Sequence, residues 1–310
     1  MKTFQDIWRS AKVTRHLYIG PVSLIFHFRR KPKITNNLLL SLKRKLFHHF
    51  FLENINEAIN TLKQEHQDFY KKESTSRQIA VIVGVGPGFG YSLVEKLAIA
   101  GYHVVAVSRD AGRLEKLVNR LILLNSNILA YSCDATDESA VKELFSYVSK
   151  NFGVPHLVVY SVQYFSPGRV TEVELPAFEE GWRNNCLGGF LVAREACRAM
   201  QAEKRGTILL VGSTSSLFAR EDHLNLAVGK FGLRALAQVL AREAWPFGVH
   251  VTHLIIDAEI DEGVERNVNR PKANPNNIAN SVLFLHEQSP DSWTSEMDTR
   301  PNQEKFWEHC

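Results

Sequence analysis

Three glycines follow a short apolar run at a place where a chain could bind phosphate. Gly84, Gly88 and Gly90 have the spacing GxxxGxG within IAVIVGVGPGFG, and Phe89 lies between the last two. Glycine lets the backbone turn sharply and approach an anion, and the free N–H groups at the start of the next helix favour negative charge. The pattern indicates a strand, a dinucleotide-binding turn and a helix, although the same spacing also serves as a plain strand-to-helix turn.

The residues that end the next apolar runs indicate which dinucleotide would fit. Ser108 and Arg109 follow the run HVVAV, at the place where an acid would bind a ribose 2′-hydroxyl and an arginine would pair with a 2′-phosphate. We therefore expect NADP(H) rather than NAD(H). Asp134 is a candidate for the adenine edge, with capping of the following helix as its alternative role. Ser161, at the end of a later run, is a further candidate for cofactor contact.

A parallel sheet would bring these residues to one edge. From Arg77 onward, short apolar runs alternate with longer segments of helical periodicity, which is typical of a doubly wound α/β fold of Rossmann type with about seven strands. The expected strands are residues 79–84, 103–108, 127–132, 156–161, 206–212 and 249–256, with a short seventh near 293–298. Two long helices are expected, from Pro176 to about Met200 and from about Leu224 to Trp245.

Further polar residues give residues 77–310 a resemblance to the short-chain dehydrogenase/reductase family. Asn185 in WRNNCLGGF is similar to the family's helix asparagine, Ser213 in ILLVGSTSS to its catalytic serine, and Lys230 in AVGKFGLRALAQ to its ribose-binding lysine. The ending SWTSEMDTRPNQEKFW resembles the tail of one subgroup. The resemblance implies hydride transfer between a nicotinamide cofactor and a carbonyl or alcohol, and a homodimer or homotetramer formed through the two long helices.

The chain departs from the family pattern around the expected nicotinamide. The family's catalytic tyrosine stands four residues before the lysine, and here that position is Leu226, which cannot donate a proton. The motif NAG after the fourth strand is replaced by Ser161-Val162-Gln163, and PG after the sixth strand by Asp257-Ala258. The chain therefore resembles an atypical subgroup that lacks the tyrosine.

Two hypotheses follow from the missing tyrosine. In the first, the protein is an NADP(H)-dependent oxidoreductase acting on a small carbonyl or alcohol, with Asn185, Ser213 and Lys230 in the catalytic site. Its proton would come from His223, from Tyr164 or from a water ordered by Ser213 and Lys230. In the second, the protein binds NADP(H) without turnover and has a regulatory or scaffolding role. A serine hydrolase fits less well, because GSTSS lacks the GxSxG elbow.

Composition separates the N-terminus from the rest of the chain. Residues 1–52 hold 11 of the 37 basic residues and one of the 33 acidic residues, so we expect a basic, partly helical extension over residues 1–76. The four cysteines form no CxxC pair, which argues against a metal site. The early apolar run at 17–28 is too short for a membrane span and has no clear secretory cleavage site.

The expected location follows from the same features. We expect a cytoplasmic protein, or alternatively a mitochondrial one or one in peripheral contact with a membrane through residues 1–52. No nucleic-acid recognition motif accompanies the basic segment, so we expect a small-molecule substrate and no nucleic-acid partner.

Overall fold

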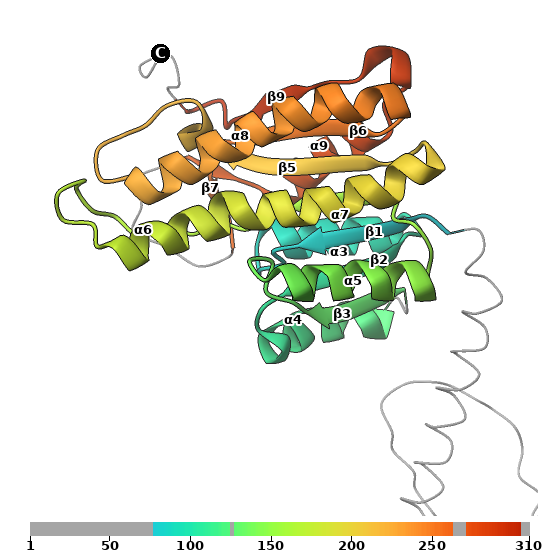
Figure 1. The fold of residues 1–310 in the computed structure, drawn as a ribbon. Coiled ribbons are helices and arrows are strands. Elements are labelled where there is room, and N and C mark those ends of the chain that lie inside the picture. The colour runs from blue at the N-terminus through green and yellow to red at the C-terminus, as the bar shows by residue number, and fades with distance from the viewer. Residues whose placement is uncertain (1–76, 125–126, 263–270, 305–310) are drawn as a thin grey trace, which may run out of the picture. The chain divides into compact units, whose positions relative to one another are not determined.

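The structure, a computed structural model, describes residues 77–124, 127–262 and 271–304. The expected N-terminal extension and its membrane contact therefore lie outside the described residues. Seven strands form one parallel sheet in the order β3-β2-β1-β4-β5-β6-β9 (Figure 1). Their bounds are β1 Ile79–Val83, β2 His103–Ser108, β3 Ile128–Ser132, β4 Leu157–Tyr160, β5 Thr207–Ser213, β6 His250–Ile256 and β9 Glu296–Thr299.

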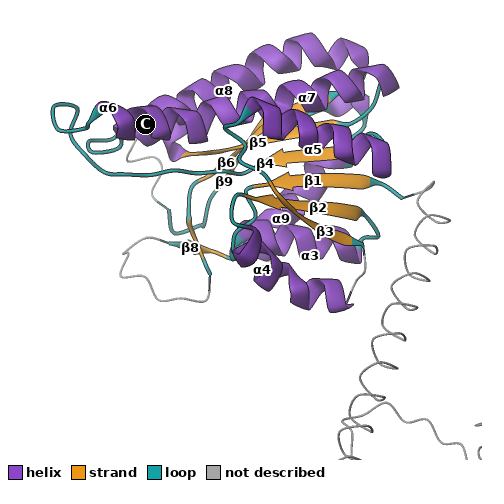
Figure 2. Ribbon diagram, turned by 60° about the horizontal axis from the view of Figure 1, so that its bottom comes forward, coloured by secondary structure: helices purple, strands orange, loops and turns teal. Residues whose placement is uncertain are grey.

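Helices cover both faces of this sheet (Figure 2). Successive residues of a strand point to opposite faces of the sheet and pack against the helices on those faces. Val81 and Val83 therefore belong to one apolar cluster, and Ala80 and Ile82 belong to the other. The first cluster includes residues of α5, α7 and α8, and the second includes residues of α3, α4 and α9. The main helices are α3 Phe89–Ile99, α4 Ala111–Leu124, α5 Glu138–Asn151, α6 Leu175–Trp182, α7 Gly188–Glu203, α8 Leu224–Ala244 and α9 Pro275–His286.

The strand order reverses between β1 and β4. β1 pairs on one side with β2 and on the other with β4, and β4 continues to β5 and β6. Chain crossovers leave a crevice at the carboxyl ends of the strands at such a reversal. The glycine turn follows β1 directly and therefore lies at this crevice. The doubly wound Rossmann fold expected from the sequence is confirmed.

Apart from small shifts in their bounds, the expected elements differ from the observed ones in three places. The seventh strand begins at Glu296 rather than at residue 293 and pairs in parallel with β6. The long helix expected from Pro176 is interrupted by a π-helical turn, η1, at Arg183–Leu187, between α6 and α7. A small two-stranded sheet, β7 (Glu259–Ile260) with β8 (Lys272–Ala273), follows β6.

Candidate functional site

The turn after β1 has a backbone that only glycine fits at its first position. Gly84 has a φ of +98°, and a Cβ there would lie 2.8 Å from the amide nitrogen of Val162. The amides of Gly84 and Val85 both donate to the carbonyl of Val107 at 3.0 Å, which fixes the turn between β2 and β4. The close approach of two backbones therefore requires glycine at this position.

The end of the turn presents the start of α3 to the crevice. A Cβ on Gly90 would lie 2.8 Å from Val85 Cα, and a Cβ on Gly88 would lie 2.7 Å from Ile260 Cγ2. Gly88 occupies the N-cap position, where no side chain caps the helix, and the first turn carries no acidic residue. The first amides of a helix have no intrahelical partner, so this end can receive an anion. These features fit the pyrophosphate of a dinucleotide.

A cavity of about 180 Å³ extends from this turn across the carboxyl ends of β4, β5 and β6. Five of the residues expected to bind the cofactor line it: Gly84, Gly88, Phe89, Gly90 and Ser161. The others that line it are Gly86, Gln163, Val211, Gly212, Ile256, Ala258, Ile260 and Glu262. Most of this second group was not singled out from the sequence, although the position of these residues at or just after strand ends was a usable signal.

Three more of the expected cofactor residues, Ser108, Arg109 and Asp134, lie at the ends of the neighbouring strands β2 and β3. Arg109 is exposed, and its carbonyl accepts a hydrogen bond from the hydroxyl of Ser132 at 3.1 Å. Ser108 is partly buried, and its carbonyl accepts from the amide of Cys133. Asp134 accepts from the amide and hydroxyl of Thr136, both at 2.9 Å. The following helix is capped by Asp137 instead, so the alternative capping role of Asp134 is wrong.

Asn185 and Lys230 both hold the backbone that follows β4. The amide group of Asn185 accepts from Tyr164 N at 3.0 Å and donates to Tyr164 O at 2.8 Å. The ammonium of Lys230 donates to Val162 O at 3.2 Å and to Val211 O at 2.9 Å. Lys230 is 1% exposed, and this burial lowers its pKa to about 7. Both polar side chains are thus satisfied by backbone groups around the cavity.

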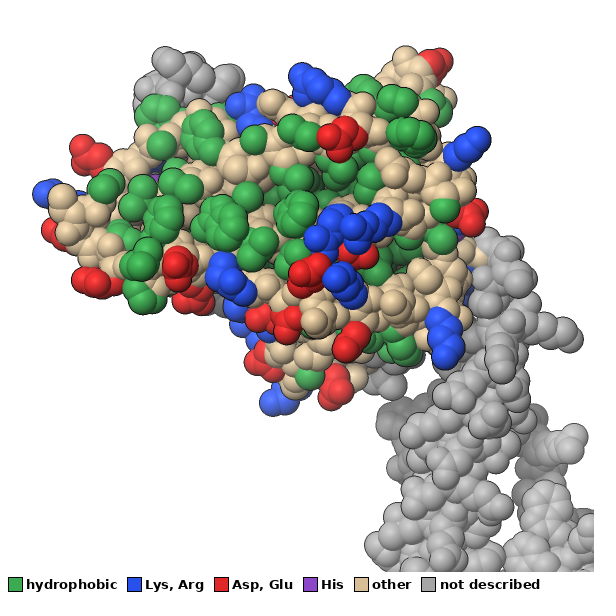
Figure 3. Space-filling view, viewed as in Figure 1, with side chains coloured by type: hydrophobic (Ala, Val, Ile, Leu, Met, Phe, Trp, Pro, Cys, Tyr) green, Lys and Arg blue, Asp and Glu red, His purple; other side chains and the backbone are tan. Residues whose placement is uncertain are grey.

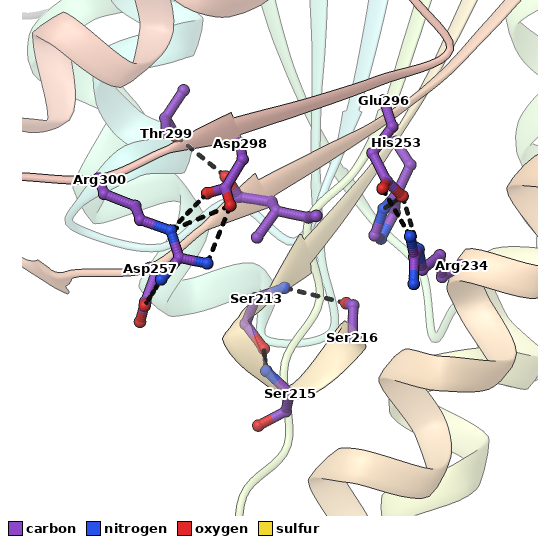
Figure 4. A network of polar contacts seen from close by, with 11 residues as sticks. Ser213, Ser215, Ser216, Arg234, His253, Asp257, Glu296, Asp298, Thr299 and Arg300 are labelled. Carbon is purple, nitrogen blue, oxygen red and sulfur yellow. Dashed lines mark hydrogen bonds and ion pairs between the residues drawn. The ribbon is translucent and has the colours of Figure 1, made fainter. Parts of the chain in front are cut away.

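Ser213 ends β5 and caps a short 3-10 turn, η2 (Thr214–Ser216). Its hydroxyl accepts from the amide of Ser215 at 3.2 Å, while its own amide donates to the hydroxyl of Ser216 (Figure 4). The side chain is partly buried, next to Gly212 of the cavity wall. Ser213 therefore has a structural role that leaves its own hydroxyl proton available to an acceptor.

His223 lies at the start of α8 and contacts the same loop after β4. Its ring stacks on Phe165 with centroids 4.7 Å apart, and its Nδ1 lies 2.7 Å from the carbonyl of Glu221. Leu226 is 6% exposed and carries no proton donor. Tyr160 of β4 cannot replace the missing tyrosine, because it is fully buried, donates to the carbonyl of Asn184 and has a pKa raised by burial.

An ion pair between Asp257 and Arg300 lies at the carboxyl end of β6. Asp257 is 1% exposed and accepts from the guanidinium of Arg300, which also donates to both carboxylate oxygens of Asp298 (Figure 4). The amide of Asp257 donates to the carbonyl of Thr299, and the Thr299 hydroxyl donates to the carbonyl of Ile255. Asp257, the first of the two residues that replace the PG motif, is therefore bonded to Thr299 of β9 and to Arg300, which follows it.

The fold, the glycine turn and the crevice define a protein with a Rossmann-type fold of the kind that binds nucleotides. The sequence profile of short chain dehydrogenases matches residues 78–264, so the chain belongs to the short-chain dehydrogenase family. This is an oxidoreductase family whose fold binds nicotinamide cofactors.

Individual relatives agree with this assignment. Sorbitol-6-phosphate 2-dehydrogenase of Escherichia coli is 29% identical over 182 residues, which are 58% of this chain and 70% of that protein. A short-chain dehydrogenase structure from Rhodopseudomonas palustris has a TM-score of 0.64 and 29% identity, over 72% of this chain and 98% of that one. A metagenomic short-chain oxidoreductase solved with NADP has a TM-score of 0.64 and 24% identity, over 73% and 97%, and shares the fold.

Within the ranges that the structure describes, no helix combines the length and apolarity needed to cross a bilayer.

Proposed function

We propose that the protein binds NADP(H) in the glycine-lined cavity and transfers hydride to or from a small carbonyl or alcohol substrate. The observation that carries the proposal is the turn at Gly84, Gly88 and Gly90. Neighbouring backbone leaves no room for a Cβ at Gly84 and Gly90, and the uncapped helix end at Gly88 opens on the cavity. The pyrophosphate would lie at this turn.

The adenosine half would extend toward β2, where the charge favours a phosphate. Arg109 is exposed at the end of this strand, and the position before it is Ser108, so no carboxylate there repels a 2′-phosphate. Asp134, at the end of β3, would lie at the adenine edge. This arrangement supports NADP(H) over NAD(H).

The nicotinamide half would extend over the ends of β4, β5 and β6, and when bound it supplies or accepts the hydride. The hydroxyl of Ser213 would donate a hydrogen bond to the substrate oxygen, and the proton that balances the hydride would be exchanged with His223. Lys230 and Asn185 would act by holding Val162 and Tyr164 in place. If Nδ1–H of His223 donates to the carbonyl of Glu221, then Nε2 is the atom that would exchange a proton.

The cavity is smaller than the whole ligand. Sites for ligands of this size have volumes of about 300–1,000 Å³, whereas this cavity has about 180 Å³. Ile260 and Glu262 lie over Gly88, and their side chains are within 3.0 Å of the place of a Gly88 Cβ. We expect these two side chains to shift when the cofactor binds.

A second candidate function is cofactor binding without turnover. Leu226 offers no proton at the tyrosine position, and the ammonium of Lys230 is bound to two carbonyls. These two observations support a regulatory or scaffolding role for the cofactor-bound protein.

Titration with NADPH and NADH tests the cofactor proposal. We expect tighter binding of NADPH, and we expect Arg109→Gln to weaken it by about tenfold or more through loss of a charge-assisted hydrogen bond, with little effect on NADH. Arg113→Gln is the matched control, because Arg113 is also exposed and lies on the next helix. Equal affinities for the two cofactors in the unmodified protein would overturn the preference for NADP(H).

Turnover distinguishes the two candidate functions. A panel of aldehydes, ketones and polyols, including sugar phosphates because of the sorbitol-6-phosphate relative, would be screened for NADPH oxidation or NADP⁺ reduction. The oxidoreductase proposal predicts a substrate whose turnover falls in His223→Ala. Binding of NADPH with no turnover across the panel would favour the non-catalytic role.

A further inference from the structure

Asp257 is a buried carboxylate at the edge of the proposed cofactor site. It stands directly after β6, between Ile256 and Ala258, and both of these neighbours line the cavity. Its side chain is 1% exposed and accepts a hydrogen bond from the guanidinium of Arg300 (Figure 4). A buried charge acts through a medium of lower polarity than water, so its field extends further than that of an exposed carboxylate.

The partner of Asp257 is held in place by the sheet. Arg300 follows β9, which pairs in parallel with β6 from His253↔Glu296 to Ile256↔Thr299. Arg300 also donates to the two oxygens of Asp298 at 2.9 and 3.0 Å, and the Asp298 side chain is 37% exposed. The pair therefore has a fixed position at the carboxyl end of β6, whereas Asp298 lies closer to solvent.

The sheet order puts this pair near one half of the cofactor only. In a fold of this kind a dinucleotide lies across the strand reversal, with one nucleotide on each side. With the adenosine half toward β2 and Arg109, the nicotinamide half lies toward β4, β5 and β6. The oxidised nicotinamide ring carries a positive charge and the reduced ring does not. A nearby fixed charge therefore changes the affinity for one form relative to the other.

We propose that Asp257 and Arg300 set the relative affinity of the site for oxidised and reduced cofactor, with opposite effects. The carboxylate of Asp257 favours NADP⁺ over NADPH, and the guanidinium of Arg300 opposes it. The sign of each effect follows from the charge of the side chain, whatever else surrounds the pair. This inference rests on the proposed cofactor site.

The test measures dissociation constants of the full chain for NADP⁺ and NADPH. Asp257→Asn should lower the preference for NADP⁺ by about threefold or more, the effect expected of a unit charge acting through partly buried protein. Arg300→Gln should raise that preference by a similar factor, and the double variant should return it toward the original ratio. Asp298→Asn is the matched control, since it contacts the same guanidinium from a more exposed position and should give a smaller shift in the direction of Asp257→Asn.

A third ligand localises the effect. The fragment 2′-phospho-ADP-ribose lacks the nicotinamide, so its affinity should be the same in all four variants. A variant that is merely less well folded would weaken all three ligands together and leave the NADP⁺ to NADPH ratio unchanged. Should Asp257→Asn fail to fold, Arg300→Gln and Asp298→Asn still give shifts of opposite sign if the inference is correct.

The outcomes separate the inference from the proposed function. The electrostatic role would be overturned if the ratio of NADP⁺ to NADPH affinity were unchanged in the variants, or if Asp257→Asn and Arg300→Gln shifted it in the same direction. It would also be overturned if the affinity for the fragment changed as much as the affinity for NADP⁺ or NADPH. Failure of the unmodified protein to bind NADP⁺, NADPH and the fragment would instead overturn the proposed cofactor site.

Discussion

At the scale of single residues, Lys230 is a buried lysine that is bonded to no carboxylate among the described residues. Its ammonium donates to two carbonyl oxygens, and burial lowers its pKa from 10.5 to about 7. Between these two values the unfolded chain binds more protons than the folded chain. The free energy of unfolding therefore rises with pH between these values, by up to ~1.4 kcal/mol per pH unit. Lys230 destabilises the folded chain most at and below pH 7.

Replacement of Lys230 by methionine should remove this pH dependence. The free energy of unfolding of the original chain, minus that of Lys230→Met, should rise by at least ~1 kcal/mol between pH 7 and pH 9. Urea unfolding at several pH values measures the difference. Lys150→Met, at the exposed end of α5, tests whether loss of any lysine has the same effect. A constant difference for Lys230→Met would show that Lys230 stays protonated throughout.

The hydrogen-bond partners of Asn185 and Lys230 could not be predicted from the sequence. Local apolar patterns indicated that Asn185 and Lys230 lie on helices that face the crevice, and both are buried. Their hydrogen-bond partners, Tyr164 and Val162, belong to a loop distant in the chain. Such contacts depend on how α8 and η1 pack on the sheet, which no local pattern specifies.

At the scale of elements, the glycine turn links β1 to α3 through contacts that differ from one glycine to the next. Gly84→Ala adds a Cβ 2.8 Å from Val162 N at a positive φ, and Gly90→Ala adds one 2.8 Å from Val85 Cα. Each should destabilise the protein by ~1–3 kcal/mol, and the displaced turn should weaken NADPH binding by about tenfold, a change of ~1.4 kcal/mol.

The same turn contains its own control. A Cβ on Gly86 has no atom within 4 Å among the described residues, so Gly86→Ala should leave the melting temperature nearly unchanged. Thermal melts and NADPH titrations of the three variants give the comparison. Equal effects of Gly84→Ala and Gly86→Ala would show that the close backbone approach at Gly84 does not determine the turn.

Strand positions were predicted well where apolar residues are continuous. The run HVVAVS gave β2 with its exact bounds because four of its six residues are buried. β9 has the sequence EMDT, whose polar residues give no such pattern, and its register is set by pairing with β6. The π-helical turn at Arg183–Leu187 adds a residue to a helical turn without changing the composition, so helical periodicity did not reveal it.

At the scale of the whole molecule, α7 and α8 expose a large apolar surface that the described domain does not cover. Phe190 on α7 is 39% exposed, and Phe231 and Val239 on α8 are 42% and 54% exposed. Figure 3 shows hydrophobic side chains gathered over these helices. A cavity of about 300 Å³ lies between them, and the charged residues Arg194, Arg198 and Glu243 line it together with Phe190, Val239 and other apolar side chains. Contiguous apolar surface of this kind is typical of an interface.

The homodimer or homotetramer predicted from the family resemblance would bury this surface between copies, and that prediction can be tested here. A two-fold axis would place the same patch of both copies in contact, so one substitution changes the interface twice. Val239→Arg would place two like charges in an apolar interface and should convert the oligomer to monomer at micromolar concentration in sedimentation velocity. Its NADPH affinity should change little, because Val239 does not line the glycine cavity.

Ile99→Arg controls for a charge added at an exposed apolar position elsewhere. Ile99 is 77% exposed at the end of α3, in the helix layer on the opposite face of the sheet from α7 and α8. This variant should keep the oligomeric state of the original chain, because its added charge can remain in water at no cost to an interface at α7 and α8. If the original chain is a monomer, there is no contact between copies at this surface. If Ile99→Arg dissociates the oligomer and Val239→Arg does not, the contact between copies lies elsewhere.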